Sequence, residues 1–190
     1  MNTSYIFRKS ALEKTQYWEL TDEGILCRQE GKTDALIPYQ KVQSIRLSYL
    51  ANNRYRLNNY CCKITAGQKT ADILSSSYEG MATFNNQADT YIPFVKELVK
   101  RVKNTNPYCN LYAGQTPFVF YGNIAFTFVI VVILFLIFYY LPISGGLSIF
   151  VRLMLIGYYA IFLVKSFRVN KPQQITGYEI PANILPEIAK

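Results

Sequence analysis

Hydrophobic residues are distributed unevenly along the chain, and two long apolar runs lie in its second half. The first, at 118–141, contains no charged residue, and the second, at 147–164, contains only Arg152. A helix needs about 20 apolar residues to cross the ~30 Å hydrocarbon core of a bilayer. The pattern therefore predicts a two-helix transmembrane hairpin, with helices at 118–141 and 147–165 and an external turn at 142–146.

Basic residues flank the predicted hairpin, whereas its turn carries no charge. Those before it are Lys96, Lys100, Arg101 and Lys103, and those after it are Lys165, Arg168 and Lys171. Positive residues are retained on the cytoplasmic side of a membrane, and residues 1–10 lack the apolar core of a signal peptide. We therefore expect a multi-pass protein of the bacterial inner (plasma) membrane with both termini in the cytoplasm.

The preceding part of the chain alternates short β-patterned runs with turn signals. The runs lie at 17–20, 25–28, 35–39, 42–49, 54–65, 69–78 and 81–84. From Ala88 to Lys103 the apolar residues instead recur every three or four positions, which predicts an amphipathic helix. The pattern predicts an α+β domain over 1–105, in which an antiparallel sheet or partly open barrel is capped by a C-terminal helix. A linker at 106–117 joins this domain to the hairpin, and a cytoplasmic tail follows at 166–190.

Composition argues against catalysis. The chain has no histidine, which excludes a histidine base or metal ligand, and its four cysteines show no paired CxxC spacing. No Gly-rich phosphate loop, GxSxG turn or HExxH motif is present. Cys27 beside Arg28 is the one weak candidate for a thiol nucleophile, and packing as a small apolar residue explains it better. We expect no enzymatic activity, no catalytic residue, no cofactor and no metal.

Several basic residues are candidates for contact with the membrane or a partner. Arg152 lies within the second apolar run, where a charge costs roughly 2.5–3.5 kcal/mol at a helix centre and less near an end. It either extends to lipid phosphates or pairs with a carboxylate of a partner subunit. The other candidates are either the signal that orients the hairpin or contacts to anionic lipid; they are Lys100, Arg101, Lys103, Lys165, Arg168 and Lys171.

Two stretches of the sequence resemble a known family. They are residues 20–25, Leu-Thr-Asp-Glu-Gly-Ile, and the step Ile37-Pro38-Tyr39 followed by Val42 and Ile45. With them the chain resembles bacterial pleckstrin-homology-like (PH-like) domain proteins that end in a two-helix membrane hairpin. The resemblance implies a PH-like fold. Eukaryotic relatives bind phosphoinositides through basic residues in the first hairpin loop, where this chain has the acidic pair at 22–23.

These features together predict a non-enzymatic integral membrane protein. It would present a PH-like module as a scaffold or accessory subunit, through protein contacts at the inner membrane. The expected partners are the lipid bilayer and a membrane protein or a second copy of the chain, and nucleic acid is not expected. Two alternatives remain: a protein that binds a lipid or small ligand between sheet and terminal helix, and an accessory subunit of a membrane enzyme or transporter.

Overall fold

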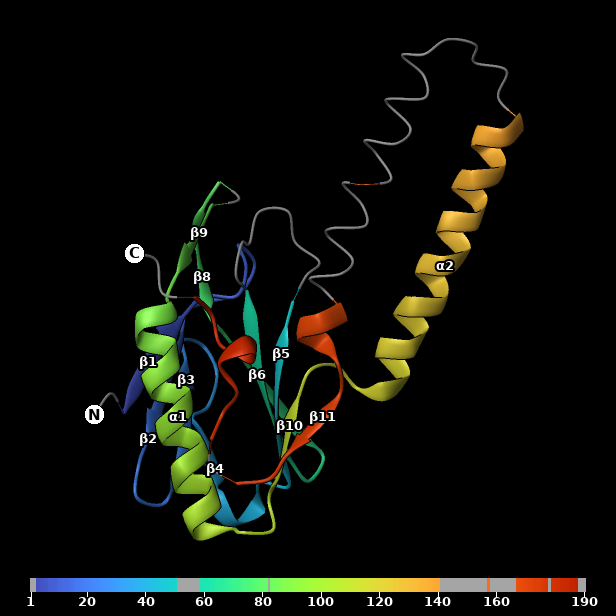
Figure 1. The fold of residues 1–190 in the computed structure, drawn as a ribbon. Coiled ribbons are helices and arrows are strands. Elements are labelled where there is room, and N and C mark those ends of the chain that lie inside the picture. Colours follow the sequence, from blue (N-terminus) through green and yellow to red (C-terminus); the bar gives the residue numbers. More distant parts are fainter. Residues whose placement is uncertain are drawn as a thin grey trace.

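The structure is a computed structural model, and it describes residues 3–50, 59–81, 83–140, 157, 167–177 and 179–187. Within the last turns of the second long helix, the side chains at 134–135 and 137–140 are not described. The described chain is α+β, with two sheets, a separate β-hairpin and helices (Figure 1).

The first sheet contains four antiparallel strands in sequence order. They are β1 (Ser4–Phe7), β2 (Gln16–Leu20), β3 (Gly24–Gln29) and β4 (Ala35–Pro38). Side chains alternate between the two faces of a strand, and Tyr5, Phe7, Trp18 and Leu20 all fall on the buried face. A Cβ at Gly24 would overlap the backbone of Ile37 on the neighbouring strand, which explains why glycine begins β3.

The second sheet has the order β11-β10-β5-β6-β7. The consecutive antiparallel strands β5 (Ser44–Tyr49), β6 (Tyr60–Ala66) and β7 (Lys69–Leu74) form its main part. Strand β10 (Asn110–Ala113) pairs parallel to β5, and β11 (Gln173–Ile175) pairs antiparallel to β10. The strands β8 (Ser76–Gly80) and β9 (Thr83–Asn86) follow β7 in the chain and form a separate two-stranded hairpin. Single turns of 3-10 helix occur at η1 (Tyr39–Lys41) and η2 (Ala182–Ile184).

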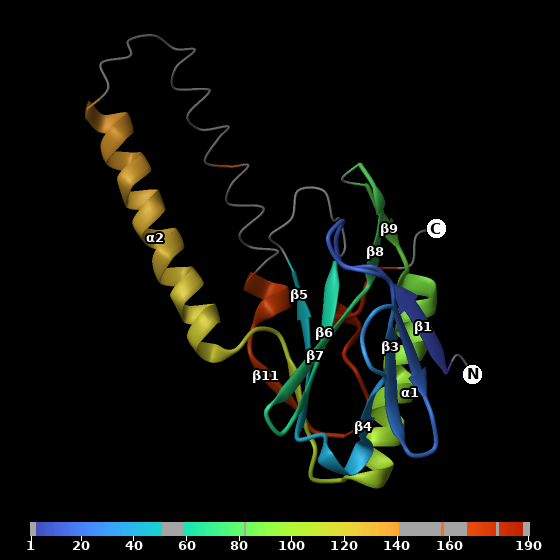
Figure 2. The same cartoon turned by 180° about the vertical axis from the view of Figure 1, so that it is seen from behind.

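Helix α1 (Ala88–Thr105) closes the space between the two sheets (Figure 2). Its apolar stripe is fully buried in the core and includes Tyr91, Phe94, Leu98 and Val102. The ring of Tyr5 on β1 lies 5.5 Å from that of Phe94, and its hydroxyl donates a hydrogen bond of 2.6 Å to the carbonyl of Leu74 on β7. The amphipathic helix predicted from the three-to-four spacing is therefore present, and its stripe joins both sheets in one core.

The carboxyl-terminal segment also belongs to this core. Strand β11 forms an edge of the second sheet, and Ile184 and Leu185 are buried, with Ile184 among the core residues. The tail at 166–190 thus packs against the β-domain over its described residues.

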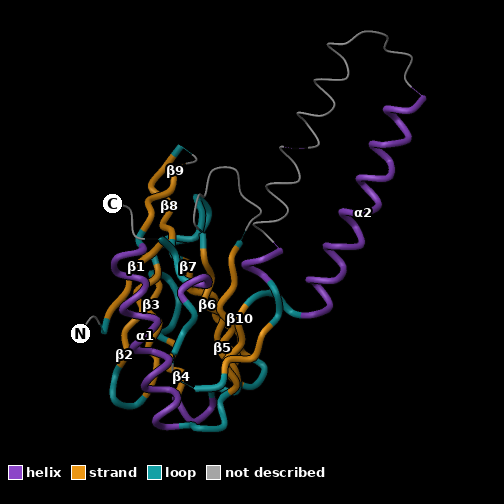
Figure 3. Tube along the Cα trace, viewed as in Figure 1, coloured by secondary structure: helices purple, strands orange, loops and turns teal. Residues whose placement is uncertain are grey.

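Helix α2 (Pro117–Tyr140) runs away from the strands (Figure 3). The predicted transmembrane hairpin is nevertheless wrong for the described residues, none of whose helices is long and apolar enough to cross a membrane. The same finding overturns the predicted multi-pass inner-membrane location. The turn at 142–146 and, apart from Gly157, the second helix at 147–165 lie outside the described residues.

Candidate functional site

Helix α2 presents the largest apolar surface in the described part of the chain. Phe118 is 90% exposed, and Tyr121, Phe126 and Phe128 are each about two-thirds exposed. The helix contains no Asp, Glu, Lys or Arg. An exposed apolar surface of this extent marks an interaction site, because water solvates it poorly.

The start of α2 is joined to the segment that returns to the sheet. The backbone N–H of Gln115 donates a 3.0 Å hydrogen bond to the carbonyl of Asn170. Gly114 has a φ of +75°, and a Cβ there would overlap the carbonyl oxygens of Asn170 and Lys171. Both its backbone angle and this close approach therefore require glycine.

The contacts of Gly114 and Gln115 with Asn170 and Lys171 form a junction at the base of α2. Arg46 on β5 contacts this junction from the other side. Its Nη1 donates hydrogen bonds to the carbonyls of Gly114 at 3.3 Å and Gln115 at 3.1 Å. Its guanidinium carbon lies 4.6 Å from the ring centre of Tyr112, within the range of a cation–π interaction. Partial burial lowers the pKa of Arg46, yet a guanidinium keeps its charge in proteins. The cation therefore supports the backbone from which α2 departs.

An aromatic contact completes this junction. Phe120, on the first turn of α2, is buried, and its ring centre lies 6.0 Å from that of Phe167 in an edge-to-face arrangement. The ring of Tyr121 lies next to that of Phe120 and remains exposed. The base of α2 is thus packed, whereas its further turns are exposed as far as the described residues show.

Two of the basic residues singled out by the sequence are used within the fold. Arg101 Nε lies 2.8 Å from Glu97 Oε1, and Arg101 Nη1 donates to the carbonyls of Leu20 at 3.0 Å and Thr21 at 3.3 Å. The hydrogen bond that Arg101 donates to the Glu97 carboxylate raises the pKa of Arg101 further. Arg101 therefore fixes α1 to the turn between β2 and β3.

Lys103 has a similar structural role at the end of α1. Its Nζ donates to the carbonyl of Cys109 at 2.6 Å and approaches that of Pro107 at 3.4 Å. These contacts close the loop between α1 and β10. The hydroxyl of Tyr39 donates to the carbonyl of Thr21 at 2.8 Å, and burial raises the pKa of Tyr39.

Lys100 belongs to a groove along the outer side of α1. The groove has a volume of about 590 Å³ and is lined by Lys96, Lys100, Asn104, Glu179 and Ile180. The first three lie one helical turn apart, so they form one line on α1. Ile180, on the opposite wall, packs against the core.

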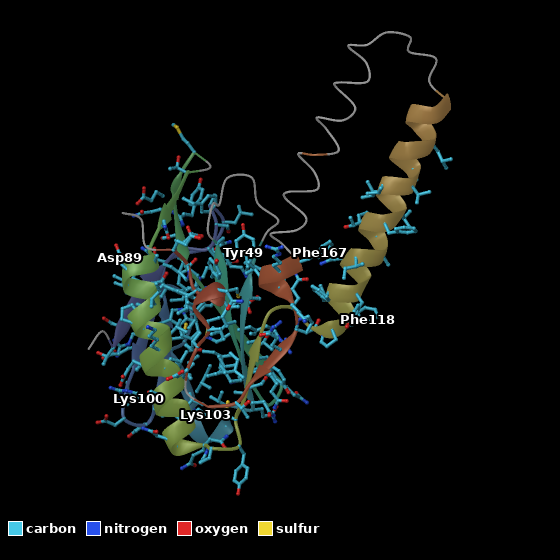
Figure 4. All side chains as sticks on the ribbon, in the orientation of Figure 1. Tyr49, Asp89, Lys100, Lys103, Phe118 and Phe167 are labelled. Atoms are coloured by element: carbon cyan, nitrogen blue, oxygen red, sulfur yellow. The ribbon has the colours of Figure 1, made fainter. Side chains whose placement is uncertain are left out.

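The remaining predicted residues lie elsewhere. Arg168 and Lys171 are exposed on the segment that returns from α2, while Arg152 and Lys165 are outside the described residues. Figure 4 shows Lys100 and Lys103 on α1, well separated from Phe118 and Phe167 at the base of α2. The predicted basic residues that are described therefore form two groups, one along α1 and one on the segment before β11.

The described thiols have the surroundings of packing residues. Burial raises the pKa of Cys61 to about 12 and that of Cys62 and Cys109 above the usual value. Burial also raises the pKa of Cys27, whose neighbour Arg28 is paired with Glu19 and Asp34. Because the thiolate is the nucleophile, these thiols are poorly reactive at neutral pH. No group of three or more acidic or thiol side chains in the described ranges could hold a metal ion.

Sequence reasoning missed the residues that hold the junction. Arg46 occupies a polar position in an alternating strand, and nothing in that pattern reveals its carbonyl partners. Asn170 is 1% exposed, and its Oδ1 accepts a hydrogen bond of 3.0 Å from the backbone of Tyr49. Asparagine and glycine beside apolar segments are weak signals of turns, and neither identifies a partner distant in the sequence.

Comparison with known proteins gives no relative to guide the assignment, since no family model, curated protein or solved structure matches this chain.

Proposed function

We propose that the protein is a non-enzymatic scaffold that acts through protein contacts, with α2 as its association helix. The exposed apolar surface of α2 is the observation that carries this proposal. The partner of that helix is α2 of a second copy of the chain. The β-domain is then the part that the assembly presents to other proteins.

Spacing along α2 supports a helix as its partner. Gly122, Ala125, Val129 and Val132 are exposed and follow one another at intervals of three, four and three residues. This is the spacing of the contact positions in paired helices. Among the described residues, nothing lies within 4 Å of a Cβ built at Gly122, which leaves room there for a neighbouring helix. Small side chains at its start allow two backbones to approach closely.

Self-pairing suits this face because it contains no charge. Two copies of α2 in parallel would place Gly122 against Gly122 and Val129 against Val129, without bringing like charges together. Fully burying a valine side chain contributes about 1.5–3 kcal/mol, so Val129 and Val132 in each copy would help to sustain a dimer. Parallel pairing would also place both β-domains at the same end of the helix pair.

The junction at the base of α2 supports a scaffold role. Gln115, Arg46 and Phe120 connect the helix to the β-domain through backbone, guanidinium and aromatic contacts. A helix held at three points transmits its orientation to the domain. Pairing of α2 would therefore orient the two β-domains as well as link them.

The proposed PH-like character has support in the order of the strands. Four antiparallel strands are followed by three more in a second sheet, by the β8–β9 hairpin, and then by a helix that closes both sheets. This is the arrangement that the resemblance implies. PH-like folds serve as protein-binding modules, although a fold alone does not establish a function.

Substitution on the two sides of α2 tests the proposal. The full chain is purified in a mild uncharged detergent, and its mass is measured by native mass spectrometry and light scattering. The wild type is expected to be a dimer, and Ala125→Trp is expected to be a monomer because the large ring prevents close approach. Thr127→Trp, about 200° around α2 from Ala125 and so on its opposite side, is the matched control and should remain dimeric.

Site-specific crosslinking identifies what covers the helix. A photoreactive residue at Val129 should link two copies of the chain in cells, whereas one at Lys69, the first residue of β7, should not. Links from Val129 to a different protein or to lipid alone would contradict the proposal, as would a monomeric wild type.

A further inference from the structure

The groove along α1 is a second surface that the association of α2 leaves open. It is formed by Lys96, Lys100 and Asn104 on one wall and by Glu179 and Ile180 on the other. We propose that this groove binds an extended, acidic segment of a partner protein. The inference goes beyond the proposed function, because it concerns α1 and not α2.

Charge is the first argument. Neighbouring Glu97 and Arg101 are paired with each other, and Lys103 is bonded to carbonyls. Lys96 and Lys100 are exposed, and neither takes part in an ion pair among the described residues. They face one carboxylate, that of Glu179, so the groove retains positive charge at neutral pH.

Geometry selects an extended peptide. Lys96 and Lys100 are four residues apart on a helix, which separates them by about 6 Å along its axis. In an extended strand, every second side chain points the same way and recurs at about 6.7 Å. Carboxylates at alternate positions of a strand therefore match the two lysines, and the intervening side chains point to the opposite wall.

The opposite wall favours apolar residues at those intervening positions. Ile180 is half-buried and packs against the core, and Ile184 holds the same segment from within the core. This wall is therefore fixed in place. The combination selects a segment in which acidic and apolar residues alternate.

A smaller hollow beyond Asn104 limits where the acidic part of the segment can lie. It has a volume of about 190 Å³ and is lined by Thr21, Asp22, Tyr39, Arg101, Asn104 and Thr105. Arg101 is already paired there, whereas Asp22 is exposed and repels carboxylates. The acidic part of the segment therefore lies against Lys96 and Lys100 and ends near Asn104.

Binding of a defined peptide tests this inference on the full chain in a mild uncharged detergent. The probe is a short fluorescent peptide of alternating Glu and Leu, and its affinity is measured by anisotropy at low salt. The wild type is expected to bind it, and the same peptide with Gln for Glu should bind on the order of tenfold more weakly.

Paired variants locate the site. Lys96→Glu with Lys100→Glu should abolish binding, and Lys96→Gln with Lys100→Gln should weaken it on the order of tenfold. The control, Lys32→Glu with Lys69→Glu, changes the net charge of the protein by the same amount at two positions outside the groove. This control should retain binding. Thermal unfolding monitored by circular dichroism checks that each variant is folded.

Three results would overturn the inference. They are absence of binding to the wild type, equal loss in the groove and control variants, and affinity that does not depend on the acidic residues. Inorganic phosphate and vesicles of anionic lipid are tested in parallel. If either of these binds through Lys96 and Lys100 while the peptide does not, the inference is wrong. The mass of the dimer is measured separately from peptide binding. Failure of the groove proposal can therefore be distinguished from failure of the proposed association through α2.

Discussion

The backbone N–H of Tyr49 donates a hydrogen bond of 3.0 Å to Oδ1 of Asn170, which follows it by 121 residues in the chain. The carbonyl of Asn170 also accepts the N–H of Gln115. One buried side chain and its own backbone therefore join the end of β5, the start of α2 and the segment that leads to β11. The position of α2 on the domain depends on this residue.

Replacing Asn170 by alanine should destabilise the protein by about 1–3 kcal/mol, because it leaves the N–H of Tyr49 without its acceptor in the interior. The free energy of unfolding from urea titration measures the effect. Asn183→Ala is the control, since Asn183 is exposed on η2 and should change the stability by less than about 0.5 kcal/mol. Equal stability of the two variants would show that Asn170 does not hold the junction.

Gly114→Ala should be more damaging than an ordinary glycine substitution. The new methyl group meets two carbonyl oxygens, and the backbone is left-handed as well. Gly67→Ala provides the comparison, because Gly67 has a φ of +62° but open space around it. We expect about 1–2 kcal/mol of destabilisation at Gly67 from backbone strain and at least about twice that at Gly114. Thermal melts of both variants decide the matter, and similar melting temperatures would contradict the close approach.

Arg101→Met should destabilise the packing of α1 against the β2–β3 turn. The variant retains a long apolar side chain but loses the contacts to Glu97, Leu20 and Thr21. It leaves the half-buried Glu97 without its cation, so we expect a loss of about 1–3 kcal/mol. Lys100→Met, one residue earlier and exposed, should leave the free energy of unfolding nearly unchanged. A neutral effect of Arg101→Met would show that the turn is held by other contacts.

Stability should fall at alkaline pH. Burial raises the pKa of Tyr60 and of Cys61 to about 12, from ordinary values of 10.0 and 9.0. The folded protein therefore keeps protons that the unfolded chain releases, and stability decreases with pH wherever the folded state binds more protons. The contribution is complete below pH 9.0 and is lost as the pH rises toward about 12.

Urea titrations across this alkaline range measure the slope. The variant Cys61→Ala should be less stable near neutral pH but should lose less stability on further alkalinisation. Tyr17→Phe is the control for removal of a tyrosine hydroxyl at a position that is about half exposed. A wild-type stability that stays constant up to pH about 12 would contradict the burial of these groups.

The local elements of the domain were predictable because their patterns are local. Trp18 and Leu20 alternate with polar neighbours on β2, and Phe94, Leu98 and Val102 follow the helical period on α1. Such periods depend on which side of an element is buried. Strand β1 escaped notice because Tyr5 and Phe7 give only one repeat of the alternation, although both are buried against α1.

The arrangement of the second sheet was not predictable in the same way. Leu111 on β10 lies beside Ile45 on β5 and opposite Ile175 on β11. These partners are far apart in the sequence, and a strand of three or four residues has too short a pattern to specify its neighbour. The residues that hold the strands together, Arg46 and Asn170, act on backbone carbonyls and N–H groups, which have no sequence signature.

The groove was only partly accessible to sequence reasoning. Lys100 was recognisable as a basic residue on the polar side of an amphipathic helix. That Arg101 and Lys103 are occupied by Glu97 and by carbonyl groups depends on the approach of the β2–β3 turn and of the loop before β10. Only the tertiary structure therefore shows which of these basic residues have partners and which do not.

The antiparallel pairing of β10 with β11 has a mechanical consequence. Ala113 pairs with Gln173 at the end of the two strands from which the chain leaves toward α2 and comes back. A force that pulls the chain apart at Ala113 and Gln173 would separate the two strands from that end and break their hydrogen bonds one after another instead of all at once. The edge of the sheet would therefore open at a lower force than the force that unfolds the core around α1.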